Sequence, residues 1–124
     1  MRAFLLAAAV ALACAAPAFA ADDDVLASRY GNTTDAVDNQ GVHTKVYYNA
    51  DHSFQADIAG VKVHGTWAVA SGTVCLTYVD PPANMPANLP NPTCLPVVAH
   101  KVGDTWTTGE GAMKRTISLK AGIQ

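Results

Sequence analysis

The sequence predicts an all-β fold: an antiparallel meander of seven or eight strands that closes as a small up-and-down β-barrel. Three observations predict it. Apolar and polar residues alternate over several short segments, turn signals separate these segments, and no stretch of helical period is long enough to form a core helix. Closure removes the edge strands that invite aggregation, so we favour a barrel. The alternatives are a β-sandwich and an open twisted sheet.

The first twenty residues have the pattern of a secretory signal peptide. A basic Arg2 precedes an apolar run over residues 4–16, and Ala18-Phe19-Ala20 supplies the small-x-small cleavage pattern. An apolar run of about 13 residues is too short to cross a bilayer core of about 30 Å as a helix, so we expect no transmembrane segment in the mature chain. The expected organisation is a signal peptide (1–20), a flexible N-terminal segment (21–28) and a single β-domain (29–124).

The cysteines agree with export to the periplasm or the medium. Cys75 and Cys94 remain after cleavage, and an even count in an exported chain predicts one disulfide. Ala11-Leu12-Ala13-Cys14 resembles a bacterial lipobox, so the alternative is a lipid anchor through Cys14.

The charge balance of the mature chain gives no electrostatic footprint for a nucleic-acid partner. Seven basic and ten acidic residues remain once Arg2 is removed, which gives a net charge of −3. Nucleic-acid-binding domains carry a basic surface instead, so we expect no nucleic-acid partner.

Residues 61–79 carry the clearest strand pattern, two alternating segments separated by Ser71-Gly72. A two-residue turn there places Trp67 opposite Leu76, and Gly65 opposite Tyr78, on the face that we expect to be buried. A tyrosine ring over a cross-strand glycine covers its bare backbone. Cys75 falls on the opposite face.

The remaining strands are expected over 30–37, 42–49, 54–58, 95–101, 103–108 and 113–120. In the last of these, alternation places Met113, Ile117 and Leu119 on one face. His52 lies in a tight loop position that calls for positive φ, which histidine tolerates. Pro96 cannot donate to a strand ladder, so it belongs at an edge or a bulge.

A proline-rich loop over residues 80–93 interrupts the strands. Long loops of this kind are often functional, and Met85 and Leu89 give this one apolar surface on a stiff backbone. It is interpreted as a lid, a protein-docking loop or a spacer between strands.

Catalytic and metal-binding motifs are absent from the sequence. The histidines (His43, His52, His64 and His100) lack ligand spacing, and no nucleophile motif occurs. Most carboxylates are expected in turns: Asp35, Asp38, Asp51, Asp80 and Asp104. An enzyme would need a site assembled in space, for which His43, His64 and Asp57 are the candidates. We therefore expect no catalytic residue, metal or cofactor.

Two resemblances carry limited information. The segments YYNADHSF, HGTWAV and CLTY resemble an arrangement found in small, uncharacterised exported proteins of proteobacteria. Gly65-Thr66-Trp67 resembles the GxW of lipocalins and of exported bacterial protease inhibitors, although in those families it lies in the first strand. The resemblance implies a tryptophan that anchors a small barrel, and it carries over no functional residue.

These observations together favour an exported, non-enzymatic β-domain that binds a small apolar ligand or an envelope protein. A narrower alternative is an inhibitor of a secreted or periplasmic hydrolase, and a third is a small hydrolase. The residues expected to contact a ligand or partner are Trp67, Tyr78, Met85, Leu89 and Trp106. A ligand carrier requires that the Trp67 face enclose a cavity.

Overall fold

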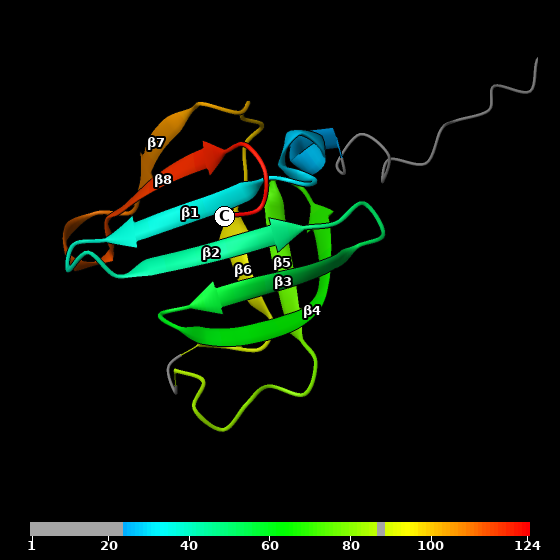
Figure 1. The fold of residues 1–124 in the computed structure, drawn as a ribbon, viewed down its shortest axis with the longest axis vertical. Helices are drawn as coiled ribbons and strands as arrows, with labels where there is room; N and C mark the ends of the chain where they lie inside the picture. Colours follow the sequence, from blue (N-terminus) through cyan, green and yellow to red (C-terminus); the bar gives the residue numbers. More distant parts are fainter. Residues whose placement is uncertain (1–23, 87–88) are drawn as a thin grey trace, which may run out of the picture.

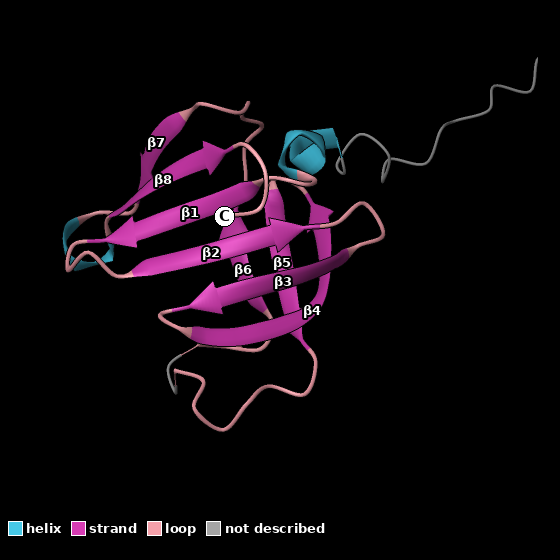
Figure 2. Ribbon diagram, viewed as in Figure 1, coloured by secondary structure: helices cyan, strands magenta, loops and turns pink. Residues whose placement is uncertain are grey.

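The computed structural model describes residues 24–86 and 89–124, so the predicted signal peptide and Cys14 lie outside the described residues. Eight strands and two short 3₁₀ helices make up the described chain (Figures 1 and 2). The elements are η1 (Asp24–Arg29), β1 (Thr33–Asp38), β2 (His43–Tyr48), β3 (Ser53–Ile58), β4 (Val61–Ala70), β5 (Thr73–Tyr78), β6 (Thr93–Pro96), β7 (Thr105–Thr108), η2 (Gly111–Met113) and β8 (Arg115–Lys120).

All strands belong to one antiparallel sheet in the order β6-β5-β4-β3-β2-β1-β8-β7. The predicted all-β class and antiparallel meander are therefore confirmed. The sheet curls through 247° as an open half-barrel, so the prediction of a closed barrel is wrong. The pair that would close an eight-strand meander, β1 with β8, does form. The sheet is broken instead between β6 and β7, which are its two edges.

The connection between β6 and β7 explains why this pair does not form. Pro96 ends β6 and cannot extend a ladder. The following chain is bonded elsewhere: the Arg29 guanidinium donates to the Val98 carbonyl at 3.0 Å, and the Ser28 hydroxyl donates to the His100 carbonyl. Backbone groups that pair with side chains of η1 are not available for a β6–β7 ladder.

The register of the β4–β5 hairpin is as predicted. Trp67 pairs with Leu76, and Gly65 pairs with Tyr78. Ser71 and Gly72 both have positive φ, as the two-residue turn requires. His52 also has positive φ, at 69°, as expected from its loop position.

The concave face of the sheet forms the core. Its buried members are Leu26, Tyr48, Phe54, Ala56, Val63, Trp67, Val69, Val74, Leu76, Tyr78 and Val97. Gly65 lies among them, and an added Cβ would lie 1.8 Å from the Thr77 carbonyl oxygen and 3.0 Å from the Phe54 ring. Phe54 thus joins Tyr78 in covering the bare glycine backbone, and the two rings meet edge to face.

Three segments differ from the sequence prediction. The strand expected over 95–101 is β6, Thr93–Pro96, and residues 97–101 lie in no strand. Residues 24–28, expected to be flexible, belong to η1, where Leu26 packs into the core with 0% exposure. Met113 was expected to share a strand face with Ile117 and Leu119, but it lies in η2 and is exposed.

Cys75 and Cys94 form the predicted disulfide. They are directly opposed in the β5–β6 ladder, so the bond ties the proline-rich loop to the sheet at its base. No helix of the described segments is long and apolar enough to cross a membrane. A disulfide is compatible with a periplasmic or secreted location.

Removing the disulfide is expected to lower the free energy of unfolding by about 3 kcal/mol, because a loop of 19 residues is then unconstrained in the unfolded chain. The comparison is between the Cys75→Ser/Cys94→Ser protein and the oxidised protein in urea denaturation. An unchanged midpoint in the double variant would contradict the expectation.

Candidate functional site

Trp67 and Tyr78, two of the residues expected to contact a ligand, are part of the packed core. Trp67 is 2% exposed, its Nε1 donates to the Asn49 carbonyl at 3.0 Å, and its ring stacks on His52 at 4.2 Å. The Tyr78 hydroxyl donates to Thr93 Oγ1. Their interior positions are filled by protein side chains, so the Trp67 face is a core surface.

The proline-rich loop, at the lower end of the sheet in Figure 1, is attached to the core. Met85 is partly buried against the core cluster, and Leu89 is half-buried. The Asn91 side-chain amide receives a hydrogen bond from the Tyr78 N–H and donates one to the Tyr78 carbonyl. Met85 and Leu89 therefore turn part of their apolar surface inward, which reduces what the loop offers to a partner.

Trp106 is the fifth predicted contact residue. It lies on β7, at the gap between β6 and β7, which we call the opening. Its ring stacks on His100 at 3.4 Å between centroids, and the Arg29 guanidinium carbon lies 5.5 Å from the Trp106 centroid. His100 in turn contacts the Asp104 carboxylate at 3.3 Å. The opening is therefore lined by stacked cationic and aromatic groups.

Arg29 is the least expected member of this group. It is only 5% exposed and forms no ion pair with any residue of 24–86 or 89–124, and its buried Nε has no hydrogen-bond partner there. Burial lowers the pKa of Arg29, and the neighbouring Tyr48 hydroxyl partly offsets this. Burial likewise raises the pKa of Tyr48. Sequence reasoning missed Arg29 because no local pattern marks a cation as buried.

Exposed apolar side chains accompany the opening. Leu95, Val98 and Val102 lie on or just after β6, and Val98 is 67% exposed. Isolated exposed apolar residues are ordinary, but three within eight residues beside two unpaired strand edges are a feature of interaction surfaces.

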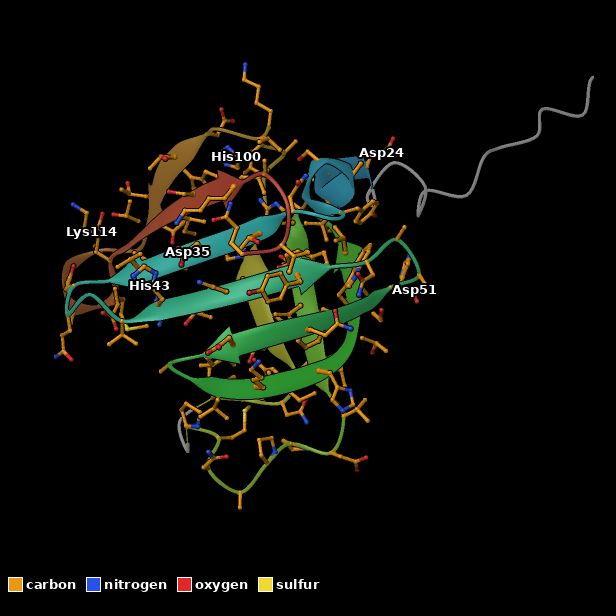
Figure 3. All side chains as sticks on the ribbon, in the orientation of Figure 1. Asp24, Asp35, His43, Asp51, His100 and Lys114 are labelled. Atoms are coloured by element: carbon orange, nitrogen blue, oxygen red, sulfur yellow. A yellow bond between two sulfur atoms is a disulfide. The ribbon has the colours of Figure 1, made fainter. Side chains whose placement is uncertain are left out.

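A second polar group lies on the convex face of the sheet, where Asp35 and His43 are neighbours on β1 and β2 (Figure 3). Asp35 is 2% exposed, and its two oxygens contact His43 Nδ1 and Lys120 Nζ, each at 2.8 Å. The sequence analysis placed Asp35 in a turn, which is wrong because it lies within β1. Burial alone would raise the pKa of Asp35, but the hydrogen bonds and charges of Lys120 and His43 outweigh it and lower the pKa.

The Lys120→Met substitution is expected to lower the free energy of unfolding by about 1 kcal/mol at neutral pH, since it leaves the buried Asp35 carboxylate with His43 Nδ1 as its remaining side-chain partner and Lys120 itself is partly exposed. A lowered pKa means that Asp35 stabilises the fold above its ordinary value of 3.8 and that this stabilisation is lost as the pH falls below it. The difference in the free energy of unfolding between Lys120→Met and the parent should therefore disappear at low pH. Urea denaturation at a series of pH values measures it.

Lys62→Met is the matched control for this experiment, because Lys62 is also exposed on the convex face and has no ion pair within the described segments. It should change the stability by less than about 0.5 kcal/mol. A loss of stability in Lys120→Met that persists at low pH would show that the loss does not come from the ion pair with Asp35.

Of the residues proposed for an assembled catalytic site, Asp57 lines one hollow with His43 and another with His64, but the two histidines do not converge. His43 lies beside Ala59 at one end of β2, whereas His64 pairs with Gln55, which pairs with Tyr47. Four residues along β2 and two strand spacings separate the histidines, a distance of roughly 15 Å. General acid and base groups on one substrate must lie closer than this, so the arrangement gives no support to a His43–His64 site.

No group of three or more histidine, cysteine, aspartate or glutamate side chains in the described chain is placed to hold a metal ion. Comparison of the sequence with protein-family models and with characterised proteins, and of the fold with solved structures, found no match. The opening and the convex polar group are therefore interpreted from their own chemistry.

Proposed function

We propose that the protein is an exported, non-enzymatic β-domain that binds a partner protein along the free edge of β7 at the opening. The observation that carries the proposal is the pair of unpaired edges, β6 and β7, in a sheet that otherwise nearly encloses its core. An unpaired edge is a template for an added strand, which pairs through the backbone.

The β7 edge is the better template of the two. Thr105–Thr108 contains neither proline nor charge, whereas β6 includes Pro96 and the disulfide. The Leu119 N–H donates to the Asp104 carbonyl, and alternation along an antiparallel ladder then directs the backbone groups of Thr105 and Thr107 toward the free side.

Charge indicates the kind of segment that would bind. Residues 101–120, which contain β7 and β8, carry four basic and two acidic side chains. Residues 21–100 carry three basic and eight acidic ones. The region around β7 is therefore the basic part of an acidic protein, which favours an extended acidic segment as the partner.

The packed Trp67 face favours this proposal over a carrier with an internal cavity. Protein side chains fill the interior positions. A small apolar ligand could therefore contact only the half-buried Trp106 at the opening. An inhibitor of an envelope hydrolase is a special case of the same proposal, with a loop of the hydrolase as the added segment.

The test uses two labelled octapeptides, alternating Glu-Val and alternating Lys-Val, with fluorescence anisotropy as the readout. The Glu-Val peptide should bind and perturb the amide signals of Thr105 and Thr107, and the Lys-Val peptide should not bind. Thr107→Pro removes an outward N–H and should weaken binding at least about ten-fold, whereas Thr107→Val keeps that N–H and should bind like the parent.

Equal binding by Thr107→Pro and the parent would overturn the proposal, as would binding of neither peptide. Quenching of tryptophan fluorescence by an apolar dye that the Glu-Val peptide does not displace would favour a small-ligand role instead.

A further inference from the structure

A polar hollow on the convex face lies apart from the opening. It is lined by Asp35, Val42, His43, Lys45, Asp57, Ala59, Gly60 and Lys120. These residues come from four adjacent strands, β8, β1, β2 and β3, from the residue before β2 and from the turn after β3. The ladder holds their backbones in fixed register.

The carboxylate at the base of the hollow is already neutralised. Asp35 uses one oxygen for His43 and the other for Lys120, and it is nearly inaccessible. Because Asp35 accepts from Nδ1, it directs the other ring nitrogen of His43, Nε2, away from the carboxylate. His43 is 53% exposed, so that nitrogen is accessible.

Lys45 is the group that has no partner. It is directly opposite Asp35 on one side and Asp57 on the other, yet it forms no ion pair or side-chain hydrogen bond within the described residues. Asp57 instead accepts from the Gly60 N–H at 2.8 Å, and its other neighbour in the ladder is Lys62. The Lys45 ammonium group is therefore free to bind an acceptor.

We propose that this hollow binds a small divalent oxyanion of the phosphate or sulfate class. Lys45 and Lys120 donate to its oxygens, and His43 donates from Nε2 when the ring is protonated. These donors match the several acceptor oxygens of such an ion better than a single carboxylate.

The charged groups that line the hollow are Asp35 on β1, Lys120 on β8, Lys45 on β2 and Asp57 on β3. Because the two lysines and the two carboxylates offset one another in charge, binding depends on the donors that point at the ion.

The test is a titration of the isotope-labelled protein with sodium sulfate, followed by NMR, at constant ionic strength set with sodium chloride. Saturable shifts are expected at His43 and Lys45. Inorganic phosphate should compete for the same shifts, and acetate should bind more weakly.

Lys45→Met should abolish the saturable shifts, and His43→Gln should retain weak binding. Lys62→Met removes a neighbouring lysine that does not line the hollow and should bind sulfate like the parent. Absence of saturation in the parent, unchanged binding by Lys45→Met, or equal loss in Lys62→Met would overturn the proposal. Unperturbed amide signals elsewhere show that each variant is folded.

Discussion

Replacing Gly65 with alanine is expected to lower the free energy of unfolding by at least about 3 kcal/mol, a large share of the stability of a small domain. The added Cβ would lie 1.8 Å from the Thr77 carbonyl oxygen, which belongs to the neighbouring strand. Relief requires β4 and β5 to separate in the middle of the sheet, because the obstructing atom is backbone. Urea denaturation followed by tryptophan fluorescence measures the loss.

Gly60→Ala is the matched control for Gly65→Ala. Gly60 has φ of +89°, and an added Cβ there has no neighbour within 4 Å. Gly60→Ala should lower the free energy of unfolding by about 1 kcal/mol, because only the backbone conformation disfavours alanine there. Equal losses in the two variants would show that the close approach at Gly65 is not what requires glycine.

Replacing Trp67 with alanine is expected to cost about 3–5 kcal/mol, since the change removes a large ring from the centre of the concave face. Trp67→Phe keeps most of the apolar volume but removes one of the two donors to the Asn49 carbonyl, which also accepts from the His52 N–H, so it should cost about 1–2 kcal/mol. Thermal and urea denaturation give both values.

Trp106→Ala provides the comparison for Trp67→Ala. Trp106 is only half-buried, at the opening, so its loss should cost less than half as much as that of Trp67. A Trp67→Ala protein with nearly parental stability would mean that the Trp67 face is not the packed centre of the domain.

The β4–β5 hairpin is the part of the fold that sequence predicts best. Alternation fixes which residues share a face, and Ser71-Gly72 fixes the turn, so the register follows from adjacent residues. Cys75 and Cys94 were predictable as a pair because only two cysteines follow the predicted cleavage site. The edge position of Pro96 follows from its missing N–H.

The candidate sites were much less predictable. Trp67 and Tyr78 were expected at a ligand or partner surface because large aromatic residues serve both cores and binding sites, and their interior positions are filled. Arg29 and Asp35 were missed because what makes them unusual is their surroundings. Arg29 bonds to a carbonyl 69 residues away, and the Asp35 carboxylate pairs with a lysine 85 residues away.

The sequence by itself determined most of the strands, their turns and the buried faces of the central hairpin, because each depends on residue chemistry over a few neighbouring positions, and it determined the disulfide because only two cysteines follow the predicted cleavage site. Only the tertiary structure decided that β1 pairs with β8 while β6 and β7 stay apart, and which charges are buried. These outcomes depend on contacts between distant segments: η1 bonds to the chain that follows β6, and Lys120 reaches Asp35 across the sheet. The proposed partner edge and the proposed anion hollow both arise from those contacts.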